Sequence, residues 1–471
     1  DGGNINIKAP ENINLKGEGK ISVETTGQGN AGTIDIQTQN LNLSDKVAIS
    51  AETNSGGKAG NIEIYSPLLT IGENAQISAT AKENATNTEP GGGNISIFSN
   101  QLNISGQGGI LAETKGNGPA GNITFKPYKA NPNLEQTQST LNITFTEKGF
   151  ISASTSSTGL GGNIDISAPE TIDITGDGEI SVKTTGAGQG GNILIKAKEA
   201  IDIAGDGKIS ASTSGAGKGG NIDIIAPETT LNITGDGEIS ASTSSTSSTG
   251  EGGNIQLNAT EKLNITGDGQ ISARTSGAGN AGNISIETPN LTTDQIKITA
   301  STEAEGTGGS IKATTETLNL NNNSKLTVKT NSTGKAGDID IQTGSLTVAK
   351  DTEISAQTEG TGKGGNINIS GAEKLNITGV GQISGSTSGA GQGGNIDISA
   401  PETIDITGDG EISVKTAGAG NAGNISIETQ NLTTEQIKIT ASTEANSSGD
   451  AGNIEIKTGS LRVDNDAQIS A

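Results

Sequence analysis

The sequence predicts a single right-handed parallel β-helix, an all-β solenoid with three short strands in each coil of about 29 residues. Three observations lead to this fold class. A motif recurs along the whole 471-residue chain, most often at steps of 28 or 29 residues. Each copy contains three runs in which apolar and polar residues alternate, and turn-forming residues separate the runs. Self-similarity at a fixed period is the signature of a solenoid, in which no unit buries its apolar face alone.

The repeat has sixteen copies, and the tripeptide that opens each copy sets the register. Longer steps contain local insertions, near residues 81–91, 126–139 and 244–252, after which the phase resumes. We therefore expect one continuous domain over residues 1–471 with about 16 coils. The register positions are Asn4, Thr33, Asn61, Asn94, Asn122, Asn163, Asn192, Asn221, Asn254, Asn283, Ser310, Asp338, Asn366, Asn395, Asn424 and Asn453.

The copy that begins at Asn163 illustrates the three strands. Its runs 163–170, 171–178 and 179–188 alternate with period 2, which is typical of half-buried strands. The first run ends in Ala-Pro-Glu, the second in Gly-Asp-Gly, and the third in a loop rich in Gly, Ser and Thr. β-Branched residues and the frequent Gly and Pro argue against helices. The side chains expected to face inward are Ile164, Ile166, Ile172, Ile174, Ile180 and Val182.

Three strands and three corners per copy fit one coil of a β-helix. Each strand would pair with its equivalent in the next coil, about 4.7–4.9 Å away. Parallel crossovers are almost always right-handed, which sets the expected hand. A β-propeller is the rival architecture, but its blades need four strands and about 40 residues or more.

Composition excludes several function classes. Apolar residues make up 30% of the chain and the net charge is −23, values that would indicate disorder without the periodic placement of Ile, Leu and Val. The absence of Cys and His removes thiol chemistry, disulfides and imidazole ligands. An acidic chain without Trp and with only two Arg is a poor partner for nucleic acid. There is no Met and no signal-peptide pattern, so we expect a fragment of a longer chain.

The Asn that opens 13 of the 16 copies is the clearest column of equivalent residues. Stacked side-chain amides can hydrogen-bond along the axis, as in amyloid Asn ladders. We expect a structural ladder here, with ligand binding by the column as the alternative. Its members include Asn163, Asn192, Asn221, Asn254, Asn283, Asn366, Asn395, Asn424 and Asn453.

A second polar column runs along the second strand and includes Asp173 and Asp202, which should lie on adjacent coils and face solvent. Paired carboxylates can serve glycoside hydrolysis when a pocket separates their pKa values. Here acidic residues recur along an open face without His, so we predict that the protein is not an enzyme.

The Gly-Asp-Gly corners carry the only candidates for a metal, the weak Ca²⁺ ligands Asp177, Asp206, Asp236 and Asp268. Stacked carboxylates repel, and a bridging Ca²⁺ would relieve the repulsion. Because Ca²⁺ prefers six to eight oxygens and Gly-Asp-Gly is ordinary turn sequence, we favour turns, with no resident cofactor.

Two further features are candidates for contacts. The third strand presents a row of Ser residues in copies such as 151–155 and 209–213, which we expect to be a solvated face. The insertion 126–139 departs from the repeat, and its Lys126, Tyr128 and Lys129 form a candidate contact loop. Insertions in repeat proteins often map to a binding face.

The string Gly-Gly-Asn-Ile-Asp-Ile-Ser-Ala-Pro-Glu at 161–170 recurs at 393–402, each time followed by Gly-Asp-Gly-Glu-Ile-Ser. It resembles the large filamentous-haemagglutinin-like exoproteins of the two-partner secretion class, particularly their cyanobacterial versions. The resemblance covers essentially the whole chain. It implies a β-helical protein exported through an outer-membrane transporter to the bacterial cell surface or medium, with roles in adhesion, surface coating and biofilm matrix.

Two function classes follow. The first is a secreted structural stalk or fibre that supplies length and stiffness. The alternative is an adhesin that binds surface glycans through its ladders and the 126–139 insertion. The exposed edges of the end coils could pair head to tail between copies of the chain, or further coils could continue the solenoid.

Overall fold

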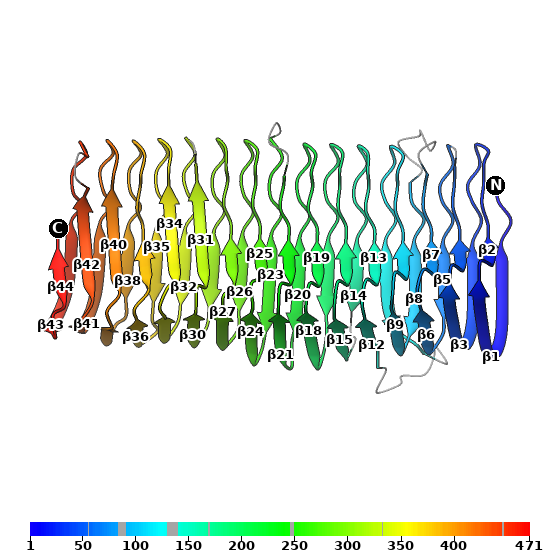
Figure 1. Ribbon diagram of the computed structural model, residues 1–471, viewed down its shortest axis with the longest axis horizontal. Helices are drawn as coiled ribbons and strands as arrows, with labels where there is room; N and C mark the ends of the chain where they lie inside the picture. Colours follow the sequence, from blue (N-terminus) through cyan, green and yellow to red (C-terminus); the bar gives the residue numbers. More distant parts are fainter. Residues whose placement is uncertain are drawn as a thin grey trace. The chain divides into compact units, whose positions relative to one another are not determined.

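The computed structural model describes residues 1–54, 56–82, 91–129, 140–167, 170–244, 249–331, 333–444 and 447–471. Contacts divide the chain into two compact units, residues 1–241 and 242–471. Each unit is a stack of coils built only from β-strands in its described part (Figure 1). The predicted parallel β-solenoid with three strand positions per coil is therefore confirmed. The hand of the coils stays a prediction.

The described residues of unit 1 include eight strands at the third position of the coil. They are β2 (Lys20–Ser22), β4 (Ala48–Ser50), β7 (Gln76–Ser78), β10 (Gly109–Leu111), β13 (Phe150–Ser152), β16 (Glu179–Ser181), β19 (Lys208–Ser210) and β22 (Glu238–Ser240). The first and second positions are occupied by β1 (Ile5–Gly17), β3 (Ile34–Asp45), β5 (Ile62–Tyr65), β6 (Leu68–Ile71), β8 (Ile95–Ser99), β9 (Gln101–Ile104), β11 (Ile123–Pro127), β12 (Asn142–Phe145), β14 (Ile164–Ser167), β15 (Thr171–Ile174), β17 (Ile193–Lys196), β18 (Ala200–Ala204), β20 (Ile222–Ala226) and β21 (Thr230–Thr234).

Unit 2 repeats this plan, and its described part again has eight strands at the third position. These are β25 (Gln270–Ser272), β28 (Lys297–Thr299), β31 (Lys325–Thr330), β34 (Glu353–Thr358), β37 (Gln382–Ser384), β40 (Glu411–Thr416), β42 (Lys438–Thr443) and β44 (Gln468–Ser470). The other positions hold β23 (Ile255–Ala259), β24 (Lys262–Thr266), β26 (Ile284–Glu287), β27 (Asn290–Asp294), β29 (Ile311–Thr314), β30 (Thr317–Asn321), β32 (Ile339–Gln342), β33 (Ser345–Val348), β35 (Ile367–Ser370), β36 (Lys374–Gly379), β38 (Ile396–Ser399), β39 (Thr403–Thr407), β41 (Ile425–Glu435) and β43 (Ile454–Asp464).

Strands pair in parallel with their equivalents one coil away, and in some coils this pairing continues through the first corner. In each unit the first and second strands belong to one sheet and the third strands to another. In β1 and β3 a single strand runs through both positions, and their pairing shifts register only between Ala9 and Asn12. The Ala-Pro-Glu sequence therefore bends a continuous sheet there, because hydrogen bonding to the next coil continues on both sides of it.

The core consists of stacked aliphatic columns. All six side chains predicted to face inward in the Asn163 copy are at most 1% exposed. Ile164 lies between Ile123 and Ile193 in the register, and Ile180 lies between Ile151 and Ile209. Each burial removes an apolar side chain from water, which is worth roughly 1.5–3 kcal/mol. This dense burial explains how a chain with few apolar residues folds.

A column of glycines stands directly before the register Asn. In unit 1, a Cβ added at any of these glycines would lie 1.6–1.9 Å from the carbonyl oxygen of the equivalent Gly one coil earlier. Backbone cannot give way as a flexible side chain can, so only Gly fits. The column comprises Gly32, Gly60, Gly93, Gly121, Gly162, Gly191 and Gly220.

We predict that Gly191→Ala lowers the free energy of unfolding by at least about 2 kcal/mol, because its Cβ would meet the Gly162 carbonyl oxygen at 1.7 Å. Thermal unfolding followed by circular dichroism is the measurement. Gly72→Ala is the matched control, since the nearest atom to its Cβ would be 3.6 Å away. Equal melting temperatures for the two variants would contradict this account.

A column of buried Thr residues lies just after the third strands, on the inner side of the coils. Its members pair coil to coil by parallel bridges, for example Thr184 with Thr213 and Thr358 with Thr387. Thr213 Oγ1 donates to the Thr184 carbonyl oxygen at 3.0 Å. The hydroxyls of Thr330, Thr358, Thr387 and Thr416 instead are buried without a hydrogen-bond partner among the described residues. Burying such a hydroxyl costs free energy.

Thr387→Val is therefore expected to stabilise the protein by about 1 kcal/mol, since it removes a buried hydroxyl and keeps the shape. Thr213→Val should destabilise it by a similar amount, because a hydrogen bond is lost. Chemical denaturation of both variants tests the difference in sign. A loss of stability in Thr387→Val would show that its hydroxyl is paired in solution.

Candidate functional site

The Asn column forms a ladder, but mainly through a different hydrogen bond from the one expected. In coil after coil the side-chain Oδ1 accepts from the backbone N–H of the register residue in the next coil. Asn163 Oδ1 accepts from Asn192 N at 2.9 Å, and Asn192 Oδ1 accepts from Asn221 N at 3.0 Å. Amide-to-amide bonds of the amyloid kind occur at fewer steps, such as Asn192 Nδ2 to Asn163 Oδ1 at 3.2 Å.

The acceptor role of the ladder explains why Asp can replace Asn at the register position. Asp338 replaces Asn in one copy, and its Oδ1 accepts from Asn366 N at 2.8 Å. At Ser310 the column supplies only the backbone donor, to Asn283 Oδ1 at 2.8 Å. Three residues earlier, a second ladder has the same geometry where Asn or Asp is present, as in Asn30 Oδ1 accepting from Lys58 N at 2.8 Å. Both ladders satisfy backbone N–H groups in the segment that leads into the first strand.

Asn94→Asp should keep nearly full stability, because the Asp retains the oxygen that accepts from Asn122 N at 2.9 Å. Asn94→Ala should lose about 1 kcal/mol, since this N–H loses its partner. The two variants can be compared by thermal unfolding at neutral pH. A ladder that depended on amide donors would make the Asp variant the worse one.

The acidic column on the second strand is half-buried and contains the predicted neighbours. Asp173 and Asp202 are direct register partners in β15 and β18. Burial raises the pKa of Asp173, and the charge of Asp202 adds to the effect. Asn232 in the next coil donates from Nδ2 to Asp202 Oδ1 at 2.6 Å. The column is thus a hydrogen-bonded surface row.

The Gly-Asp-Gly corners are tight turns. The first Gly of each has a positive φ, 69° at Gly176 and 72° at Gly205. Asp177, Asp206, Asp236 and Asp268 follow these glycines and are exposed. Lys148 Nζ lies 3.9 Å from Asp177 Oδ2, so a lysine from the preceding coil already partly balances that charge. Among the described residues, no group of three or more acidic side chains is placed to hold a metal ion.

The candidate contact loop is described only at its start. Lys126 and Lys129 are exposed and Tyr128 is half-buried, while residues 130–139 lie outside the described residues. The Tyr128 backbone N–H donates to the Ser99 carbonyl oxygen at 3.0 Å, which extends the pairing of β11 with β8. Residues 83–90 and 245–248, in the other two predicted insertions, also lie outside the description.

The Ser row of the third strands differs from the solvated face that the sequence suggested. Ser152 is 7% exposed and Ser181 is 4% exposed. These short side chains lie between rows of longer ones and bond across coils, as Ser78 Oγ does to Glu52 Oε1 at 2.7 Å. The expectation of a solvated face was wrong for this first Ser column, which forms the floor of a trough between longer side chains, whereas Ser154 and Ser212 at the second outward position are half-buried.

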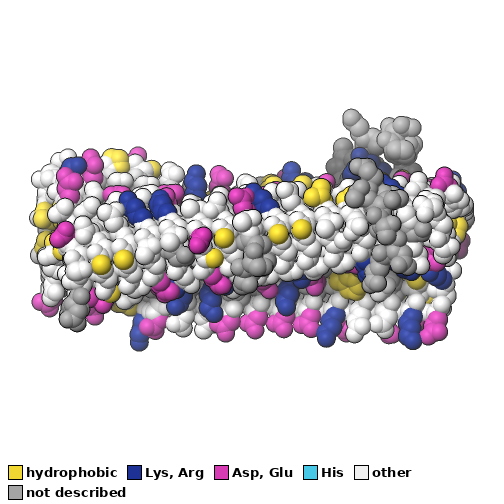
Figure 2. All heavy atoms as spheres, turned by 90° about the horizontal axis from the view of Figure 1, so that it is seen from above, with side chains coloured by type: hydrophobic (Ala, Val, Ile, Leu, Met, Phe, Trp, Pro, Cys, Tyr) yellow, Lys and Arg dark blue, Asp and Glu magenta, His cyan; other side chains and the backbone are white. Residues whose placement is uncertain are grey.

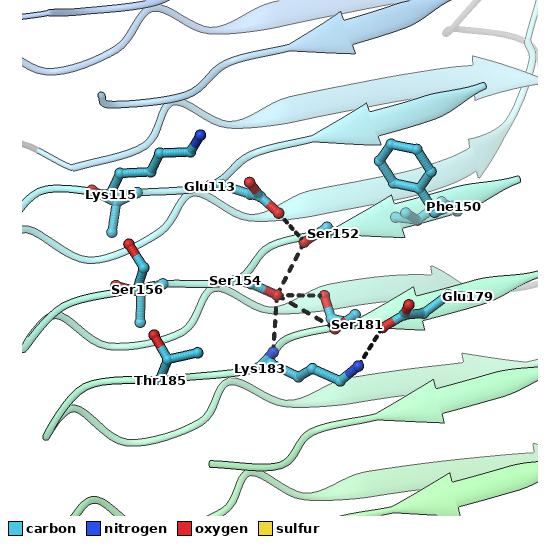
Figure 3. Close-up of a pocket in the computed structure, with 13 residues that line it drawn as sticks. Glu113, Lys115, Phe150, Ser152, Ser154, Ser156, Glu179, Ser181, Lys183 and Thr185 are labelled. Atoms are coloured by element: carbon cyan, nitrogen blue, oxygen red, sulfur yellow. Dashed lines mark hydrogen bonds and ion pairs between the residues drawn. The ribbon is translucent and has the colours of Figure 1, made fainter. Parts of the chain in front are cut away.

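At β10, β13 and β16 this trough widens into a groove of about 330 Å³ (Figure 3). A hydrogen-bonded chain crosses it: Ser152 donates to Glu113 Oε1, and Ser154 Oγ lies 3.0 Å from Ser152 Oγ and 3.4 Å from Ser181 Oγ. The Phe150 ring lies on one side of this chain in Figure 3. The side chains of Lys115, Ser156 and Thr185 lie on the other side.

Four charged side chains lie close together in the groove. Burial raises the pKa of Glu113, outweighing the Ser152 hydrogen bond and the nearby Lys115, and the charge of Glu179 adds to the rise. Glu179 Oε1 itself accepts from Lys183 Nζ at 2.6 Å. Two carboxylates and two ammonium groups therefore line the groove together. Such a site can hold a polar ligand by hydrogen bonds and stack it against an aromatic ring.

The groove was missed in the sequence, although two signals mark it. All six aromatic residues of the chain lie between Tyr65 and Phe150. The third strands usually begin with a charged or amide side chain and have Ser or Thr two residues later, whereas β10 has Gly109 and Leu111. Both departures from the repeat fall within three successive coils.

Comparison with known proteins finds no matching protein-family model, no matching curated protein and no matching solved structure. In the described part of the chain, no helix has the length and apolarity needed to cross a bilayer. The solenoid and the groove are therefore the observations from which a function is inferred.

Proposed function

We propose that this protein is a structural element of the bacterial cell surface or extracellular matrix, a stalk or fibre that supplies length and stiffness. The observation that carries the proposal is the uninterrupted stacking of near-equivalent coils within each unit. Each coil adds one strand spacing, about 4.7–4.9 Å, at the cost of about 29 residues. Repetition of this kind builds an extended scaffold, because stability adds from coil to coil.

The ladders support this role. Within each unit, successive coils are joined by strand pairing and stacked core residues, and at most steps also by the Asn ladder, so local opening must break several contacts at once. Regions with dense hydrogen bonding and few exposed backbone groups open rarely, which is the property that resists proteases.

The surface also suits a protein that works in water and at high local concentration. On the face shown in Figure 2, acidic and basic side chains are interspersed, and apolar groups are small and isolated. Among the described residues, large exposed apolar side chains away from the end coils are few and scattered, such as Leu160 and Val380. The net charge of −23 adds repulsion between copies.

The extracellular location rests on the resemblance of the repeat to filamentous-haemagglutinin-like exoproteins, in which an outer-membrane transporter would be the export partner. No cofactor and no catalytic step is part of the proposal. Head-to-tail association of copies through their end coils would extend the fibre further.

Protease added to intact cells that make the protein should remove it, and electron microscopy of purified protein should show slender particles. Deleting residues 163–220, two coils of 29 residues, joins Gly162 to Asn221 in register and should shorten the particle by about 10 Å in solution scattering. Deleting 163–205 is the control, because it breaks the register and should unfold the neighbouring coils. Compact particles, or protein protected inside the cells, would refute the proposal.

A further inference from the structure

The coils between Tyr65 and Phe150 differ from the rest of the chain because they contain its aromatic residues. Phe125 and Phe145 fill the core there and are fully buried, whereas Tyr65, Phe98, Tyr128 and Phe150 are only half-buried. Among the described residues, Phe150 is the only aromatic residue on the outer side of the third-strand sheet. Half-buried aromatic side chains in a chain that otherwise lacks them indicate a local task beyond holding coils together.

The position of the Phe150 ring depends on Gly109 in the preceding coil, because Gly109 has no side chain. Phe150 pairs with Gly109 in the register, and a Cβ on Gly109 would lie 2.2 Å from the ring. The ring therefore leans over the Gly109 backbone and cannot do so over Glu179, its other neighbour. Leu111, in place of the usual Ser, adds apolar surface to the same strand. The Phe150 ring itself makes an apolar platform at one side of the groove.

The opposite side of the groove offers polar groups. Within the described part of the chain, no hydrogen bond from the side chain of Lys115, Ser156 or Thr185 is found, and Figure 3 shows them in a row facing the Glu113–Ser152–Ser154 chain. A ligand lying across that chain would meet an aromatic ring at one side and these donors and acceptors at the other. Hydroxyl groups on both partners would satisfy one another.

The charge balance restricts the ligand class. Glu113 and Glu179 are countered by Lys115 and Lys183, so the groove has no net charge of its own, within a protein of net charge −23. Polyanions would be repelled by the whole molecule, and the two lysines offset the attraction of Glu113 and Glu179 for a cation. A neutral molecule rich in hydroxyls, with one apolar face, matches the platform and the polar row together.

We propose that the groove between β10, β13 and β16 binds a neutral saccharide, with one sugar ring stacked on Phe150 and bonded through its hydroxyls to Glu113, and with a second ring extending toward Ser156 and Thr185. The groove's volume of about 330 Å³ is at the small end of ligand sites and suits one or two sugar rings. This inference does not depend on the stalk function, because a scaffold of any purpose could carry the site.

The full-length protein is tested against immobilised neutral oligosaccharides of glucose, galactose, mannose and N-acetylglucosamine, with sialylated and uronic acid oligosaccharides alongside. The oligosaccharide that binds best is then titrated by calorimetry. Binding to at least one neutral oligosaccharide, in preference to the charged ones, is expected. Failure of every neutral oligosaccharide to bind, or a preference for the charged ones, overturns the proposal.

Phe150→Ala and Glu113→Ala should each weaken that binding about tenfold, through loss of stacking and of a charged acceptor. Phe150→Tyr should keep it, since the ring remains. The matched controls are Phe98→Ala, on the outer side of the first-strand sheet, and Glu52→Ala, at the equivalent place two coils earlier. Thermal unfolding of each variant shows that the fold is kept. Unchanged affinity in Phe150→Ala, or an equal loss in Phe98→Ala, overturns the proposed site.

Discussion

The vertical alignment of equivalent residues in successive coils is the constraint on which the rest of this structure depends. Parallel strand pairing holds each coil one strand spacing from the next, and two columns at the start of the first strand enforce that alignment. The glycines before the register position leave no room for a Cβ between stacked backbones. The Asn side chain that follows accepts a hydrogen bond from the backbone N–H of the equivalent residue in the next coil. A slip of one residue would turn every apolar side chain outward, so the alignment and the core specify each other.

Once the alignment is set, each column tolerates substitutions that preserve its own physical role. The core columns accept Ile, Leu, Val and Phe, because all are apolar and the stack can adjust to their shapes. The Asn ladder accepts Asp338, because only the acceptor oxygen is required. The corner before Asp177 takes Gly, whereas Asp45 and Glu147 also adopt positive φ at related corners. The sequence variation among copies therefore maps the requirements of each position.

A protein built from columns places functional groups where a column is interrupted. Gly109, Leu111 and Phe150 interrupt the outer columns of the third-strand sheet in two adjacent coils, and the groove lies there. Elsewhere on that sheet, charged and Ser side chains alternate and pair with their neighbours, as Glu52 does with Ser78. A stalk and a saccharide site are compatible on this plan, since a few altered coils leave the stacking of the others intact.

Repetition made the strand positions, the inward residues and the Asn column predictable from the sequence, because periodic spacing alone determines which side chains share a face and a column. Three outcomes depended on the tertiary structure. The Ser row became buried because longer side chains on either side rise above it. The Asn ladder used backbone donors because the next coil presents its N–H beside Oδ1. The groove formed because Gly109 leaves space that Phe150 from another coil occupies, and no local pattern states how two residues 41 positions apart will meet.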